Sequence, residues 1–189
     1  MNERELLVDC LGRLNTLAFP YYLTDSMASN YWGIPRTTHD IDFVIALVAA
    51  NVDRIVAAFS DVFHIDERAV RAAFDPPHQF NAIDTRSSLK IDFWLAQQTP
   101  FENSMFERRM HTTLFGSEVW LASPEDVILH KLYWNKITPS ERQLGDAAGI
   151  VAVQGEHLDR RYLLRWSDSL GVTDYMARLL RGEIRPKQS

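Results

Sequence analysis

Two aspartates separated by one apolar residue, Asp40 and Asp42, are the side chains whose types and spacing first suggest chemistry. They begin a run of β-forming residues, Asp40–Leu47, and successive side chains of a strand point to opposite faces. Asp40 and Asp42 would therefore share one face, about 7 Å apart. Neighbouring carboxylates repel each other unless a cation neutralises them, so this spacing indicates a divalent metal site. The pair is also compatible with the exposed face of an edge strand.

A polar turn at Asp25-Ser26 precedes this strand and suggests a second site. It joins an apolar strand, Phe19–Leu23, to a helix-compatible segment, Met27–Trp32, which Gly33 breaks. Backbone amides and a hydroxyl at a strand-to-helix turn favour a phosphate, which makes Ser26 a candidate. Asp25 either caps this helix, since aspartate is a preferred N-cap, or competes with a phosphate for the same amides.

The order of these features resembles the nucleotidyltransferases of the polymerase-beta superfamily, in particular small bacterial members related to abortive-infection toxins. The stretches Leu23–Ala28 and Gly33–Asp42 carry the resemblance. The family has a glycine before the serine of the turn, where this chain has Asp25. That exchange adds a negative charge where the family binds the triphosphate, so we expect weaker nucleotide binding and lower activity in this sequence.

The resemblance implies a set of catalytic and metal-binding residues. Asp40, Asp42 and Asp92 would hold two magnesium ions, and Asp92, on a neighbouring strand, would also help to take the proton from the acceptor hydroxyl. Nucleotide binding would involve Asp25, Ser26, Arg36 and Lys131.

Two of the nucleotide-binding candidates have simpler interpretations. Arg36 could be an inert surface arginine. Lys131, within the segment Glu125–Leu132 that is typical of these proteins, could be a solvent lysine. On the next predicted helix, Arg142 and Asp146 are four residues apart and could form an ion pair.

The periodicity predicts an α/β (α+β) fold, a small mixed β-sheet flanked by helices with a C-terminal helical bundle. The resemblance implies that the sheet and its helices are a nucleotidyltransferase core. We expect a core at residues 1–122 and a C-terminal helical region at 123–189 packed on it. The expected strands are Phe19–Leu23, Asp40–Leu47, Gln79–Asp84, Ser88–Ala96 and two within His111–Leu121. The expected helices are Glu3–Thr16, Met27–Trp32, Asn51–Ser60, Asp66–Phe74, Phe101–Arg109, Ser123–Asn135, Ser140–Val153, Asp159–Leu170 and Val172–Arg181.

Composition narrows the class of protein. A net charge of −5 and 46% hydrophobic residues are typical of an ordinary globular protein and disfavour a strongly basic nucleic-acid module. The one cysteine, Cys10, is in phase with leucines and reads as a core residue. The longest apolar run, Phe43–Ala50, is far shorter than the roughly 20 residues that cross a bilayer. We therefore expect a cytoplasmic protein with no membrane partner.

These observations favour a magnesium-dependent nucleotidyltransferase that moves a nucleoside monophosphate from an NTP to an acceptor hydroxyl. The acceptor is open: tRNA, protein or a small molecule. The basic region from Leu158 onward would suit tRNA. The resemblance to toxins also makes an antitoxin protein a candidate partner. The alternative is a non-catalytic nucleotide- or partner-binding protein that keeps the fold, which Asp25 favours.

Overall fold

The computed structural model describes residues 1–186, which form two compact units. The first unit contains residues 1–24 and 39–121. The second unit contains residues 25–38 and the chain from Ala122 onward. The chain therefore crosses from one unit to the other after Thr24, after Thr38 and after Leu121.

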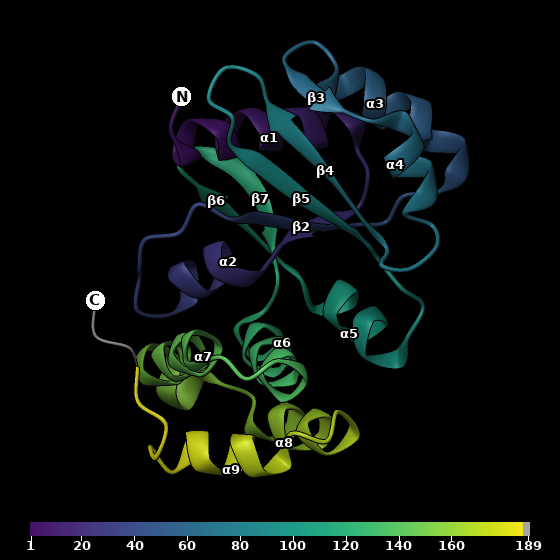
Figure 1. Ribbon diagram of the computed structural model, residues 1–189. Helices are drawn as coiled ribbons and strands as arrows, with labels where there is room; N and C mark the ends of the chain where they lie inside the picture. The colour runs from purple at the N-terminus through teal and green to yellow at the C-terminus, as the bar shows by residue number, and fades with distance from the viewer. Residues whose placement is uncertain (187–189) are drawn as a thin grey trace. The chain divides into compact units, whose positions relative to one another are not determined.

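The first unit is built on a seven-stranded mixed sheet with the order β3-β4-β5-β2-β1-β7-β6 (Figure 1). The pairs β2·β5 and β1·β7 are parallel and the other neighbours are antiparallel. This arrangement confirms the predicted mixed sheet. The strands are β1 (Tyr21–Leu23), β2 (Ile41–Ile45), β3 (Phe63–Ile65), β4 (Gln79–Asp84), β5 (Lys90–Leu95), β6 (Met110–Leu114) and β7 (Ser117–Leu121).

Helices α1 and α3 pack side by side in this unit (Figure 1), and Arg13 of α1 donates from Nη1 to the Ala58 carbonyl of α3 at 2.5 Å. Phe59 of α3 contacts the sheet edge-on at Phe93, 5.5 Å between ring centroids. Cys10 is fully buried, as predicted for a core residue. The helical segments of the unit are α1 (Glu3–Leu17), the 3-10 turn η1 (Ala49–Asn51), α3 (Val52–Phe59), α4 (Glu67–Ala72) and α5 (Pro100–Arg108).

The second unit is helical. Its longest helices, α6 and α7, begin as predicted: Ser123 caps α6 with Pro124 at the first helical position, and Ser140 caps α7. The segments of the unit are α2 (Asp25–Trp32), α6 (Pro124–Ile137), α7 (Glu141–Gln154), the 3-10 turn η2 (Gly155–His157), α8 (Arg160–Ser169) and α9 (Thr173–Leu180).

Helix α2 packs closely on α6 and α7. Trp32 donates from Nε1 to the Ala122 carbonyl at 2.8 Å, and its own carbonyl accepts from Gln154 at 2.6 Å. A Cβ at Gly33 would lie 2.7 Å from the backbone nitrogen of Ile150, so only glycine fits there. The glycine that breaks the helix in the sequence thus also allows this close approach.

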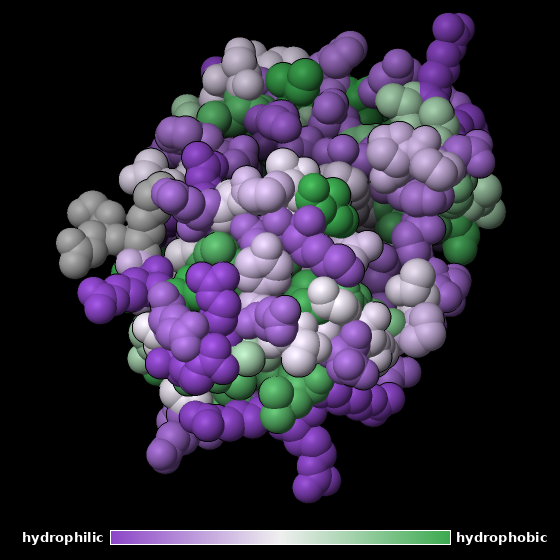
Figure 2. Space-filling model, turned by 60° about the horizontal axis from the view of Figure 1, so that its bottom comes forward, coloured by the Kyte–Doolittle hydropathy of each residue, from purple (hydrophilic) through white to green (hydrophobic). Residues whose placement is uncertain are grey.

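The face that Figure 2 turns forward is mostly hydrophilic, and its hydrophobic side chains form small, separate groups. Exposed apolar residues of the second unit include Val153 and Leu164. Within residues 1–186, no helix has the length and apolar character needed to cross a lipid bilayer. Scattered apolar side chains of this kind are normal for a protein surface.

Candidate functional site

An aromatic ladder on the apolar face of the sheet fixes the register of the strands that carry the aspartates. Phe43, Phe93 and Phe80 lie opposite one another on β2, β5 and β4. Their rings stack with centroids 5.8 Å apart for Phe43 and Phe93 and 5.0 Å for Phe80 and Phe93. A slip of one residue would turn these rings out of the core, so burial specifies the register strongly.

This register brings two of the predicted catalytic aspartates together. Asp42 is paired with Asp92 across the parallel strands β2 and β5, one position before the Phe43 and Phe93 pair. Side chains alternate, so both carboxylates are on the face opposite the rings. Because β2 lies between β5 and β1, it is an inner strand of the sheet, and the edge-strand interpretation of the aspartate pair was wrong.

Asp40 directly precedes β2, and the register continued by one residue places it opposite Lys90. The same face of β2 and β5 therefore carries a block of four charged residues: Asp40 and Asp42 on one chain segment, and Lys90 and Asp92 on the other. Lys90 was not among the residues predicted from the sequence. Alternation along one strand puts it on the same face as Asp92, but only the pairing of β5 with β2 places it beside Asp40 and Asp42.

Lys90 binds the least accessible of these carboxylates. Its Nζ donates to Asp92 Oδ2 at 2.6 Å. This hydrogen bond, opposed by partial burial and aided by the charges of Asp92, Asp40 and Asp42, raises the pKa of Lys90. Asp92 is only 6% exposed, and its other oxygen, Oδ1, is buried without a hydrogen-bond partner. A buried carboxylate oxygen without a partner is costly, so Oδ1 is suited to a ligand.

The chemistry of these side chains fits a hard divalent cation. Three carboxylates supply the oxygen ligands that magnesium prefers, and Asp92 Oδ1 has no competing hydrogen bond. Within residues 1–186, however, no group of three or more His, Cys, Asp or Glu side chains has an arrangement that could hold a metal ion. In this structure the cation that Asp92 binds is Lys90.

The four predicted nucleotide-binding residues all lie in the second unit and share one ion-pair network. Lys131 is 2% exposed and forms ion pairs with Asp25 and, at 3.0 Å, with Asp146. The solvent-lysine interpretation was therefore wrong. A buried ammonium requires such partners, because leaving it unpaired would cost several kcal/mol.

Arg36 occupies the other side of this network. Its guanidinium donates to both carboxylate oxygens of Asp146, at 2.7 and 2.8 Å, and from Nη2 to Ser26 Oγ at 2.9 Å. Two parallel bonds to one carboxylate are the strongest arrangement an arginine makes. Arg36 is thus not an inert surface residue, and Asp146 pairs with Arg36 and Lys131 where the sequence suggested Arg142.

Asp25 adopts a backbone conformation that favours glycine. Its φ is +47°, in the left-handed region that favours glycine. An aspartate tolerates this conformation better than most residues, but it still costs about 1 kcal/mol. Helix α2 begins at Asp25 itself, and the carboxylate accepts a hydrogen bond from Lys131 Nζ. The ion pair therefore helps to hold a residue in a conformation that glycine would adopt freely.

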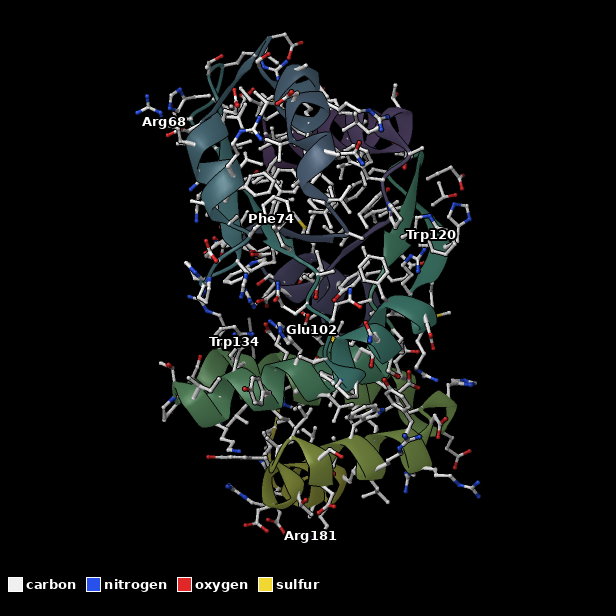
Figure 3. The ribbon with its side chains drawn as sticks, turned by 90° about the vertical axis from the view of Figure 1, so that its right-hand side faces the viewer. Arg68, Phe74, Glu102, Trp120, Trp134 and Arg181 are labelled. Atoms are coloured by element: carbon white, nitrogen blue, oxygen red, sulfur yellow. The ribbon has the colours of Figure 1, made fainter. Side chains whose placement is uncertain are left out.

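The acidic residues before Lys131 on α6 hold helices together. Asp126 accepts hydrogen bonds from Ser123 and from the Tyr162 hydroxyl of α8, each at 2.6 Å, and Glu125 accepts from the Asp159 amide at 2.8 Å. On the same helix Trp134, labelled in Figure 3, donates from Nε1 to His130 at 2.9 Å. Glu125 and Asp126 thus connect the start of α6 to the turn before it, to α8 and to the residue that precedes α8.

Acid should weaken the ion-pair network. Burial opposes ionisation of Asp146, but the hydrogen bonds from Arg36 and the charge of Lys131 outweigh burial and lower the pKa of Asp146. Because the folded state has the lower pKa, Asp146 adds stability above about pH 4, and this contribution is lost as the pH falls through the folded-state pKa. The difference in free energy of unfolding between wild type and Asp146→Asn, measured by urea denaturation, should be largest near about pH 6 and shrink toward about pH 3.

Asp53→Asn is the control for this experiment, since Asp53 is an exposed carboxylate of the first unit. Its difference from wild type should stay small across the same range. A difference for Asp146→Asn that does not change with pH would contradict the expectation.

This chain resembles known proteins in its structure. No family model matches the chain, and no curated protein matches it significantly. An antigenic nucleotidyltransferase-like protein from Paracoccidioides brasiliensis has 16% identity and a TM-score of 0.58, and the match covers 99% of this chain and 95% of that protein. The chain has a nucleotidyltransferase fold. This finding confirms the fold that the resemblance implied.

Two antibiotic-modifying proteins share this nucleotidyltransferase fold. ANT(2″)-Ia in complex with adenylyl-2″-tobramycin has 11% identity and a TM-score of 0.61, over 88% of this chain and 95% of ANT(2″)-Ia. The lincosamide antibiotic adenylyltransferase LnuA, with lincomycin bound, has 11% identity and a TM-score of 0.55, over 79% of this chain and 96% of LnuA. At these identities the comparison extends to the fold alone.

Proposed function

We propose that this chain is a magnesium-dependent nucleotidyltransferase that transfers a nucleoside monophosphate from an NTP to an acceptor hydroxyl. The observation that carries the proposal is the pairing of Asp42 with Asp92 on adjacent parallel strands, with Asp92 Oδ1 buried and without a partner. In a chain with a nucleotidyltransferase fold, a buried carboxylate oxygen without a hydrogen-bond partner supports a metal site at that carboxylate.

The residues of the aspartate block have defined roles in this proposal. Asp40, Asp42 and Asp92 would hold magnesium, which when bound stabilises the charge that develops on the phosphates. The acceptor oxygen forms a bond to the α-phosphorus, and the bond from that phosphorus to the bridging oxygen breaks. Pyrophosphate leaves, and the acceptor proton passes to Asp92 as general base.

Ser26, Arg36 and Lys131 remain the candidates for binding the triphosphate, and Asp25 is the residue that opposes them. A hydroxyl, a guanidinium and an ammonium are the groups that bind phosphate oxygens. In the free protein these groups are engaged by Asp25 and Asp146 or by one another. Nucleotide binding would require that some of these ion pairs be exchanged for contacts with phosphate.

The second candidate function is a non-catalytic nucleotide- or partner-binding protein, and one observation favours it. The network of the second unit contains two basic side chains, Arg36 and Lys131, and two acidic ones, Asp25 and Asp146. Because these charges balance, a triphosphate would meet little net positive potential there. A protein that binds no NTP would keep this network intact.

The acceptor remains to be identified among three classes. ANT(2″)-Ia was solved with an adenylylated antibiotic, which makes a small molecule with hydroxyl groups one candidate. The toxin resemblance favours tRNA or a protein, with an antitoxin as the partner that restrains the enzyme. Incubation with magnesium and each radiolabelled NTP, in separate arms with total tRNA, cell lysate and aminoglycosides, should place label in one acceptor class. No label in any arm and no pyrophosphate release would contradict the proposal.

Asp25→Gly tests whether the Asp25 carboxylate opposes nucleotide binding. Removing the carboxylate leaves one net positive charge in the network and frees a ligand position on Lys131, so NTP affinity should rise about tenfold or more. The measurement is isothermal titration calorimetry with ATP, CTP, GTP and UTP in magnesium.

Asp25→Asn is the matched control, because asparagine tolerates positive φ and has the same shape without the charge. If charge limits binding, both variants should gain affinity. If NTP affinity rises in Asp25→Gly alone, the cause is the greater backbone freedom of glycine and not the lost charge. If neither wild type nor either variant binds any NTP, the enzymatic function is wrong and only the partner-binding form of the second candidate remains.

A further inference from the structure

Lys90 is the one basic residue in the charged block of β2 and β5, and its contacts suggest a role beyond the fold. We infer that Lys90 is a built-in counterion, which pairs with Asp92 when no metal is bound and is displaced from it when a divalent cation binds. Lys90 is in this sense a positioning residue that sets metal affinity. The inference rests on the proposed function, because it concerns the same metal site.

One carboxylate oxygen of Asp92 has a hydrogen-bond partner and the other has none. Oδ2 accepts from Lys90 Nζ at 2.6 Å, whereas Oδ1 is buried without a partner. A carboxylate that is 6% exposed and has only one partner is incompletely compensated. Lys90 therefore compensates the Asp92 carboxylate only in part, and a divalent cation at this carboxylate would compensate it further.

The Lys90 side chain can move into water, whereas the Asp92 side chain is held in the protein. The Lys90 side chain is 51% exposed and the Asp92 side chain 9%. A lysine released from Asp92 would enter water, so its displacement carries little desolvation cost. A buried carboxylate cannot move to water in the same way. Replacing Lys90 by a metal therefore requires the Lys90 side chain to move and the strands to stay in place.

The charges of the four residues determine whether Lys90 weakens or strengthens metal binding. Asp40, Asp42 and Asp92 carry three negative charges, and Lys90 neutralises one of them. A divalent cation at Asp92 is repelled by the ammonium at close range, and it meets a smaller negative charge than the three aspartates alone would present. Both effects weaken metal binding, so loss of the ammonium should tighten it by about tenfold to a hundredfold.

The first experiment compares Mn²⁺ binding, followed by electron paramagnetic resonance without nucleotide, in wild type and Lys90→Met. Mn²⁺ takes the same oxygen ligands as magnesium. Lys90→Met should bind about tenfold or more tightly, and Lys90→Arg, which keeps the charge, should stay near wild type. Arg71→Met is the matched control: it removes an exposed positive charge from the same unit and should leave the affinity unchanged.

The second experiment needs no variant. Limited reductive methylation of wild type with formaldehyde and cyanoborohydride reports how freely each lysine amine reacts. Lys90 should become severalfold more reactive when Mg²⁺ is added, because its ammonium leaves Asp92. Lys136, whose Nζ donates to the Leu170 carbonyl in the second unit, is the internal reference and should not change.

The outcomes separate this inference from the proposed function. Equal Mn²⁺ affinity in wild type and Lys90→Met, with binding lost in Asp92→Asn, would overturn the role of Lys90 and leave the metal site standing. Unchanged Lys90 reactivity at saturating metal would do the same. If neither wild type nor Lys90→Met binds Mn²⁺, both the inference and the metal-dependent function are wrong.

Discussion

Asp92→Asn should lower nucleotidyl transfer by at least about 100-fold while leaving the protein folded. Asparagine keeps the shape and one carbonyl oxygen, so Lys90 Nζ retains an acceptor. The variant removes the negative charge that would hold the metal and the group that would receive the acceptor proton. The measurement is release of pyrophosphate and transfer of labelled nucleotide, with circular dichroism to check the fold.

Asp53→Asn serves as the control for Asp92→Asn, because the Asp53 side chain is 82% exposed and belongs to the same unit. It should retain wild-type activity. Asp42→Asn should resemble Asp92→Asn, since the two residues are direct neighbours across the strands. Full activity of both the Asp42 and Asp92 variants would end the proposed mechanism.

Lys131→Met should destabilise the protein by about 3–5 kcal/mol. Methionine fits the space of the buried aliphatic chain, but it leaves Asp25 and Asp146 without their shared cation. Asp146, with a side chain only 6% exposed, would then depend on Arg36 alone. Urea denaturation, followed by circular dichroism, gives the free energy of unfolding.

Lys136→Met is the matched control for Lys131→Met, because it removes an exposed lysine from the same helix. It should cost less than about 1 kcal/mol. Adding Asp146→Asn to Lys131→Met should recover part of the loss, since an uncompensated buried charge disappears. A loss below about 1 kcal/mol for Lys131→Met would show that the network contributes little to stability.

Local sequence patterns were sufficient to predict most of the elements. Each predicted helix and strand has a counterpart in the structure, because alternation of apolar residues and helix caps such as Ser123 are local signals. The strand β3 was missed, since Phe63–Ile65 is only three residues long and shows almost no alternation. Its position is determined by antiparallel pairing with β4.

The partners of charged residues could not be predicted in the same way. Asp146 was matched with Arg142 because they are neighbours on one helix, yet its partners Arg36 and Lys131 come from other segments. Lys90 was not predicted as a site residue, because only the register of β5 with β2 places it beside Asp40 and Asp42. Such pairings are set by tertiary structure, which single-sequence periodicity does not contain.

The grouping of residues 25–38 with the chain after Leu121 limits how this protein can be dissected. A truncation after Leu121 would keep α2 but remove Ala122, Gln154 and Ile150, against which Trp32 and Gly33 pack. No single cut therefore yields two independently folding fragments. We expect insoluble products from gene fusions or domain exchanges that move the C-terminal helices alone. The transferred segment must include α2 as well.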